Sequence, residues 1–224
     1  MAERPAFYTQ NGTVASRRYT FEWFPGFAAS QKRKSIESLH RAIQNADADA
    51  RPLEISTKSS EPLGQKLSAF NLKLRQVPLE NIFQSAKVFE NGGPYLDLLN
   101  VSPKDAKRDE RLKKSGRLTA FRYQGEDFPL IPQTAFYDFI YLTAVKESLA
   151  ADEIQAITDY QYFTDIEFNP AKSLNTQART AALLKLLVEQ YGRLPDFSKE
   201  DFLRYHKEHV VYLEDLPKGK PKFS

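Results

Sequence analysis

The stretch from Pro78 to Pro94 constrains the fold more than any other, because it joins a helical apolar pattern to an abrupt stop. Successive helical residues turn by about 100°, which places four apolar side chains on one face: Ile82, Phe83, Ala86 and Phe89. Three polar side chains share the opposite face: Glu80, Gln84 and Lys87. The sequence Asn91-Gly92-Gly93-Pro94 cannot continue a helix. We therefore predict an amphipathic helix from just after Pro78 to this break. The alternative to a functional polar face is a surface helix whose polar side is solvated.

Chain length and composition indicate a single domain over residues 1–224. This length suits one large domain or two small ones, with room for a sizeable core. Because neither a linker nor an internal repeat interrupts the chain, we favour one domain. Hydrophobic residues make up 41% and charged residues 27%. The first residues lack the apolar core of a signal peptide, and no run approaches the ~20 apolar residues of a membrane span. We expect a cytoplasmic protein without membrane association.

The residue types that are missing exclude several chemistries. The sequence has no cysteine, which excludes disulfides and thiolate–zinc sites. His206 and His209 stand three residues apart without partner ligands, and we expect both at the surface. Glycine-rich nucleotide motifs and a nucleophile elbow are also absent, so we predict neither metal nor cofactor. The remaining carboxylates, lysines, arginines and amides suit metal-free cleavage of a glycosidic bond.

The rest of the chain predicts many helices and few short strands. Expected strands are residues 13–24, 53–56 and 117–123, with 67–72 a strand or a turn. Expected helices are residues 30–45, 102–116, 134–149, 152–160, 178–190 and 198–209, with Ser30, Ser102 and Ser198 as caps. Residues 126–132 are typical of a connector and 162–175 of a loop. We predict a helix-rich α+β domain that ends in a basic tail, residues 217–224.

A basic triplet opens the first of these helices. Lys32, Arg33 and Lys34 lie in its first turn, where cations oppose the positive end of the helix dipole. A nearby anion would explain this placement, and an ordinary solvated turn is the alternative. The buried stripe of the same helix is expected at Ile36, Leu39, His40 and Ile43.

The central helix is similar to that of the NADAR family, also called YbiA-like. The motif of this family helix contains a glutamate, a glutamine and a lysine, and Glu80, Gln84 and Lys87 match them in this sequence. Asn81 stands where the family usually has histidine. Upstream, a Ser-Lys-rich loop, a glycine and a Ser-Asn-Phe element of the family resemble residues 56–59, 64 and 67–71. Ala69 replaces the asparagine of that element.

Two further elements follow in the order of the family. Its Ala-x-x-x-Gly-Arg element is similar to residues 106–111, and residues 163–165 and 174–175 occupy the places of its Trp-Gly-Asp and Gly-x-Asn motifs, without the tryptophan. The likeness covers about residues 53–190, behind an N-terminal extension of residues 1–52. In this extension, residues 21–40 look like the subgroup encoded beside DarT-type toxins, which ADP-ribosylate DNA. The resemblance therefore implies an antitoxin.

The activity implied by this subgroup is removal of ADP-ribose from guanine bases. The resemblance thus implies an N-glycosyl hydrolase that acts on ADP-ribosylated guanine in DNA. Direct contact with the cognate toxin is a further expectation. Other relatives cleave an N-glycosidic bond in riboflavin-pathway intermediates, which leaves a free nucleotide open as substrate. Two alternatives remain: a non-catalytic domain that binds ADP-ribose or DNA, and an antitoxin that blocks its toxin by contact.

Candidate site residues follow from the chemistry of a ribose that loses its base. Glu80 would stabilise the developing oxocarbenium charge. Lys58 would attack C1 and form a Schiff base with the opened ribose, with Lys34 and Lys87 as alternatives. Expected substrate-binding residues are Lys34, Asn71, Gln84, Lys87, Arg108, Arg111, Asp165 and Asn175. The arginines suit a pyrophosphate, and the last two residues suit ribose hydroxyls or guanine edges.

Overall fold

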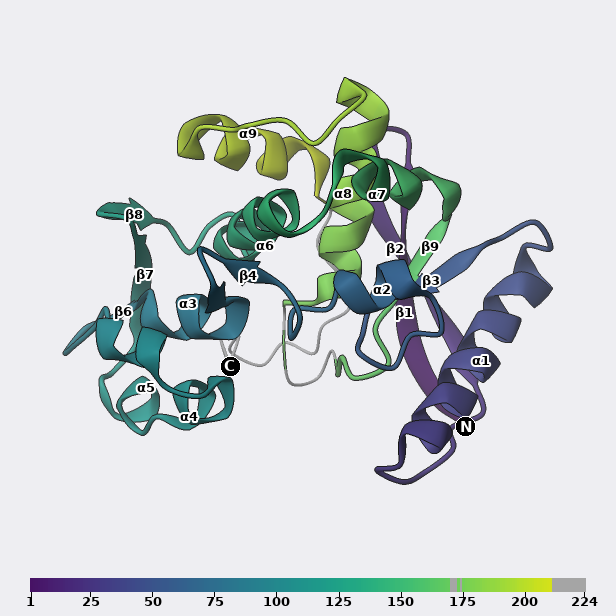
Figure 1. The fold of residues 1–224 in the computed structure, drawn as a ribbon, viewed down its shortest axis with the longest axis horizontal. Helices are drawn as coiled ribbons and strands as arrows, with labels where there is room; N and C mark the ends of the chain where they lie inside the picture. The colour runs from purple at the N-terminus through teal and green to yellow at the C-terminus, as the bar shows by residue number, and fades with distance from the viewer. Residues whose placement is uncertain (170–172, 174, 211–224) are drawn as a thin grey trace.

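The computed structural model describes residues 1–169, 173 and 175–210, and it forms a mixed α+β fold (Figure 1). Its strands in the described residues form sheets of four, three and two strands, so the predicted α+β class with short strands is confirmed. No helix in this part of the chain combines the length and the hydropathy needed to cross a membrane.

The largest sheet begins with an N-terminal hairpin. β1 (Ala2–Gln10) and β2 (Thr13–Phe21) pair antiparallel. Asn11 and Gly12 connect them with φ angles of 50° and 73°, which suit a tight hairpin turn. The strand predicted at residues 13–24 is confirmed up to Phe21, whereas its partner β1 was not foreseen.

Two strands from distant parts of the chain complete this sheet. β9 (Tyr162–Thr164) lies between β1 and β3 (Pro52–Glu54). Phe163 is opposite Phe7 on β1 and opposite Leu53 on β3. The loop predicted after residue 161 is therefore wrong at this strand. Hydrogen bonding to a neighbour on each side stabilises three residues that carry little local strand pattern.

Helices cover both faces of the large sheet. α1 (Ala29–Ala46) packs on the face of Ala6, and α8 (Gln177–Tyr191) packs on the face of Phe7. Adjacent strand residues point to opposite faces. The predicted stripe on α1 is confirmed at Ile36, Leu39 and Ile43. The predicted Ser30 cap is wrong, because the helix starts after Ala28 without a side-chain cap.

The predicted central helix is shorter than expected. α3 (Leu79–Ser85) gives way to strand β6 (Lys87–Phe89), which pairs with β7 (Leu118–Tyr123). The Arg122 N–H donates to the Ala86 carbonyl at 2.7 Å, so sheet pairing takes over the backbone bonds that a longer helix would have made. The helix prediction is wrong beyond the end of α3, and Lys87, predicted on the helix, lies on strand β6.

The polar side of α3 is buried. Asn81 and Gln84 are 0% and 1% exposed, and the Asn81 amide donates to the carbonyls of Leu98 and Val101 at 2.7 and 2.8 Å. The 3-10 helix η1 (Leu96–Asn100) packs against this side. The alternative of a solvated surface helix is therefore wrong here.

The remaining helices and strands are α2 (Pro62–Lys66), β4 (Lys73–Leu74), β5 (Val77–Pro78), α4 (Pro103–Arg108), α5 (Arg111–Lys114), β8 (Glu126–Phe128), α6 (Ala135–Ser148), α7 (Ala151–Gln155), η2 (Ala156–Asp159) and α9 (Lys199–His209). Ser102 and Ser198 cap α4 and α9 as predicted. The helix predicted over residues 102–116 breaks at Asp109, whose carboxylate accepts from the Arg111 N–H at 2.8 Å and so offers the backbone another bond. The connector predicted at residues 126–132 begins with β8, which pairs with β7.

A buried charge network anchors α9. His206 is 0% exposed, and its Nε2 lies 2.8 Å from Oδ2 of Asp138 on α6. Arg179 on α8 reaches the same carboxylate at 3.1 Å, and the Thr180 hydroxyl donates to it at 2.5 Å. The surface position predicted for His206 is wrong, because this carboxylate supplies a buried partner. His209 is exposed, as predicted.

Figure 1 shows the elements in two groups. α3, α4, α5 and β6–β8 lie on the left, the large sheet and α1 lie on the right, and α6 lies between them. Segments far apart in the sequence therefore meet in the middle of the molecule.

Candidate functional site

A pocket of about 450 Å³ opens between α3 and the segment that joins β9 to α8. Its charged lining residues are Glu80, Lys107, Asp165 and Glu167, and its amides are Asn169, Asn175 and Gln177. Aromatic rings complete the wall: Phe70, Phe83, Tyr137 and Phe168. A concave site with rings and a few converging polar groups is typical of a small-molecule site.

Three predicted site residues line this pocket: Glu80, Asp165 and Asn175. Gln84 and Lys87 lie beside it, through contacts with residues that do line it. The other predicted residues do not line it: Lys34, Lys58, Asn71, Arg108 and Arg111. Their roles stay predictions.

Glu80 occupies the first turn of α3, where the helix dipole favours a carboxylate. The Gln84 amide donates to its Oε1 at 2.8 Å, and the Lys107 ammonium lies 4.0 Å from the same oxygen. The Oε1 of Gln84 is buried without a hydrogen-bond partner among the described residues. The side chain of Glu80 is 24% exposed, so a carboxylate held in place by α3 and α4 faces the pocket.

Lys87 on β6 is only 3% exposed, and its Nζ lies 4.9 Å from the centre of the Phe83 ring. Burial lowers the pKa of Lys87 to about 8; the charge of Glu80 opposes this shift and that of Lys107 adds to it. An amine with such a pKa is partly neutral in mildly alkaline solution, as nucleophilic chemistry requires.

Asp165 follows β9 directly and is 8% exposed. Its oxygens accept from the Glu167 N–H at 3.1 Å and from the Thr176 hydroxyl at 3.4 Å. Gln177 accepts from the Ala69 N–H at 2.7 Å through its Oε1 and donates its amide to Asp165. Burial raises the pKa of Asp165 to about 8, and the nearby Glu54 carboxyl adds to the rise.

Glu54 on β3 lies next to Asp165 but does not line the pocket. It accepts from the Thr164 hydroxyl at 2.6 Å and from the Ile166 N–H at 2.9 Å, and burial raises its pKa. His40 on α1 places Nε2 2.9 Å from the same Thr164 hydroxyl. Burial lowers the pKa of His40 to about 4, so the ring is neutral at physiological pH.

Lys32 of the basic triplet of α1 pairs with Glu167, which lines the pocket. Its Nζ lies 3.3 Å from the Glu167 carboxylate and 4.9 Å from the Trp23 ring. The Arg4 guanidinium also lies over this ring, with Cζ 5.4 Å from its centre. Glu167 is thus the anion expected near the triplet. Lys34 is exposed, with its ammonium 6.0 Å from the Phe24 ring.

Most of the predicted residues outside the pocket form hydrogen bonds or ion pairs with nearby residues. Arg111 pairs with Asp97 and Asp109 at 2.6 and 2.9 Å, and these hydrogen bonds raise its pKa. The Lys58 ammonium donates to the Thr57 hydroxyl at 2.8 Å, and the Asn71 amide donates to a carbonyl. Arg108 is exposed at the end of α4.

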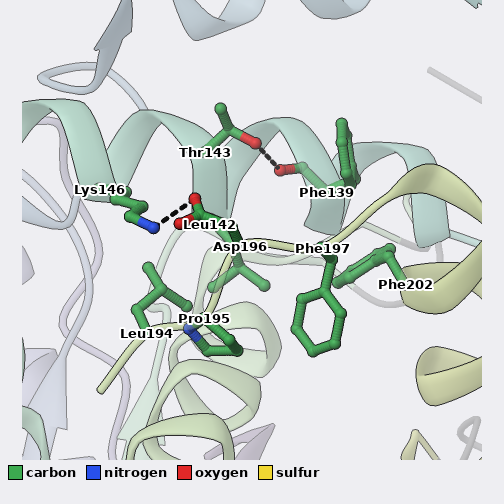
Figure 2. Close-up of a pocket in the computed structure, with 9 residues that line it drawn as sticks. All are labelled: Phe139, Leu142, Thr143, Lys146, Leu194, Pro195, Asp196, Phe197 and Phe202. Carbon is green, nitrogen blue, oxygen red and sulfur yellow. Dashed lines mark hydrogen bonds and ion pairs between the residues drawn. The ribbon is translucent and has the colours of Figure 1, made fainter.

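A smaller pocket of about 150 Å³ lies between α6 and the segment before α9 (Figure 2). Phe139, Phe197 and Phe202 give it an apolar lining, and its charged residues, Lys146 and Asp196, pair with each other. It shares no lining residue with the pocket at Glu80. Because it lacks converging polar groups, we assign the chemistry to the larger pocket.

Sequence reasoning missed Glu54, Lys107 and Gln177. A signal existed for Glu54, which stands alone between Leu53 and Ile55 on an apolar strand. The other two follow ordinary helix patterns, and only packing brings them to the pocket. In the described residues, no cluster of three or more histidine, aspartate or glutamate side chains is arranged to hold a metal ion.

A family model described as DarT1-associated NADAR antitoxin matches residues 2–214. The match includes β1 and α1, so the N-terminal extension belongs to the same family pattern as the pocket. A search of curated proteins found no similar sequence.

Proposed function

The chain belongs to the DarT1-associated NADAR antitoxin family, and we propose that it reverses the modification made by the toxin. The proposed reaction is hydrolysis of the N-glycosidic bond between ADP-ribose and guanine in DNA. One observation carries the proposal: two carboxyl groups, Glu80 and Asp165, face one pocket from different walls and in unlike surroundings. Such pairs of unlike carboxyl groups serve glycosidic cleavage.

The groups around the pocket suit a ribose that departs from its base. Glu80 supplies negative charge for the oxocarbenium character that develops at C1. The Asn175 Oδ1 is buried without a hydrogen-bond partner among the described residues, which makes it a ready acceptor for a ribose hydroxyl. The exposed Phe70 ring, 72% exposed, offers a surface on which a base can stack.

The direct test is release of free ADP-ribose from an ADP-ribosylated oligonucleotide. Glu80→Gln keeps the side-chain shape and removes the charge, so the rate should fall about 100-fold or more. Glu110→Gln is the matched control, because Glu110 is an exposed carboxylate that pairs with Lys114. A folded Glu80→Gln variant with the wild-type rate would refute the role of Glu80. Release should persist in EDTA.

Other outcomes of this assay identify the alternatives. Binding of the oligonucleotide without release would indicate a non-catalytic module, and neutralisation of a co-purified toxin without release would indicate an antitoxin that acts by contact. Borohydride would trap a Schiff base on a lysine. An adduct on Lys58 would support the sequence prediction, one on Lys87 or Lys107 would move the role to a lysine nearer the pocket, and no adduct would favour attack by water.

A further inference from the structure

Glu54 binds the residues on either side of Asp165. Its two oxygens accept from the side chain of Thr164 and the backbone of Ile166, and Glu54 is 1% exposed. The carboxyl group of Glu54 therefore fixes the short segment that carries Asp165. It also places a second buried acid beside the acid that lines the pocket.

Two neighbouring buried carboxyl groups do not ionise together readily, because their like charges repel. Hydrogen bonds to a carboxylate favour its charged form. Glu54 accepts from Thr164 and Ile166 at 2.6 and 2.9 Å. Asp165 accepts longer bonds from Glu167 and Thr176, at 3.1 and 3.4 Å, and the Gln177 amide also donates to it. The negative charge is therefore best held on Glu54, and the proton on Asp165.

We propose that Asp165 is the general acid for the departing guanine and that Glu54 is the positioning residue that keeps the proton on Asp165. This inference rests on the proposed glycosidase function. The proton passes from the Asp165 carboxyl to the guanine nitrogen as the bond from that nitrogen to C1 breaks. The electron pair of this bond stays with the base. Water adds to C1 and releases one proton to solvent, while Asp165 takes one back, so no further reactant is consumed.

The titratable groups that face Asp165 come from several elements: Glu54 on β3, Arg4 on β1, Glu80 on α3, Tyr137 and Tyr141 on α6, and Glu167. Burial raises the pKa of both tyrosines well above the usual value, so they stay neutral. Arg4 is the opposing cation: burial lowers its pKa, and the charges of Asp165 and Glu167 oppose that shift. Glu54 is the group held against Asp165 by direct bonds to its neighbours.

The pH profile of kcat/KM for ADP-ribose release tests the role of Glu54. Glu54→Gln keeps the shape and removes the charge, so Asp165 should lose its proton at lower pH. The alkaline limb should move down by about one pH unit, which lowers the rate at about pH 9 roughly tenfold and leaves the rate at about pH 6 near that of the wild type. Glu37→Gln, at an exposed site on α1, is the control. An unshifted limb, or an equal loss at every pH, would overturn the positioning role.

A measurement on the unsubstituted protein covers the case in which Glu54→Gln does not fold. Carbon-13 NMR of the carboxyl carbons should show one aspartate still protonated at about pH 7, and its signal should be missing from Asp165→Asn. The absence of such a carboxyl from the wild type would overturn the proposal whether or not ADP-ribose is released. A protonated carboxyl in a protein that releases no ADP-ribose would instead refute the proposed function, and with it the role as acid.

Discussion

Asp138 and Asp165 are both buried aspartates, yet their surroundings move their pKa values in opposite directions. Burial works to raise both values. At Asp138 the charge of Arg179 and the hydrogen bonds with His206 and Thr180 outweigh burial and hold the pKa below its usual range. At Asp165 the nearby Glu54 adds to burial, and the pKa rises to about 8.

The difference separates a structural aspartate from a chemical one. Asp138 is 0% exposed and joins α6 to α8 and α9 through its contacts with Arg179 and His206. Asp165 lines a pocket, and its raised pKa suits the proposed role of proton donor. The sign of the nearest charge, rather than the depth of burial, distinguishes the two roles.

The largest effect that we expect is the loss of activity in Asp165→Asn. An amide cannot donate a proton as an acid does, so ADP-ribose release should slow by about 100- to 10,000-fold, while the variant stays folded. Single-turnover release gives the measurement. A folded Asp165→Asn variant that releases ADP-ribose at the wild-type rate would contradict the role of Asp165 as an acid.

Asp138→Asn should instead act on stability. The substitution leaves the Arg179 charge buried without its counter-ion, which should cost about 3–5 kcal/mol in the free energy of unfolding. Urea titration measures this loss. Asp127→Asn is the matched control, since Asp127 pairs with Arg122 at the surface, and its stability should not change measurably. Equal stability of the two variants would contradict a structural role for Asp138.

Measured per pH unit, the pH dependence of stability gives the smallest effect. The pKa of Asp165 is raised in the folded state, so its contribution is fully present below the unfolded value of about 3.9 and is lost as the pH rises toward 8. The wild type should lose up to about 1.4 kcal/mol per pH unit in this window relative to Asp165→Asn. Asp138 has the opposite sign, because its lowered pKa makes its contribution disappear only in acid. Parallel stability curves for wild type and Asp165→Asn would contradict the shift at Asp165.

Local sequence patterns predicted the elements that local interactions decide. The apolar spacing of α1 and α8 and the serine caps of α4 and α9 are examples. The patterns failed where a distant strand decides the outcome. β6 looks like the end of a helix until β7 pairs with it, and β9 looks like a loop until β1 and β3 enclose it.

The candidate site was predictable in part for the same reason. Glu80, Asp165 and Asn175 stand at motif positions, and the structure brings them to one pocket. The positive charge of a residue alone did not predict that it lines the pocket. Arg111, for example, forms ion pairs with the nearby Asp97 and Asp109 instead. The approach of Lys107 and Gln177 to the pocket depends on how α4 and α8 pack, which no spacing in the sequence encodes.

The central place of β9 has a consequence for how the protein is made. Its Phe163 must meet Phe7 from the other end of the chain, and pairings between such distant residues form slowly, because a large loop has to close first. The N-terminal hairpin therefore leaves the ribosome long before the strand that completes its sheet. A chain cut short ahead of β9 lacks the whole side of the pocket that carries Asp165, so interrupted synthesis yields no fragment with a complete candidate site.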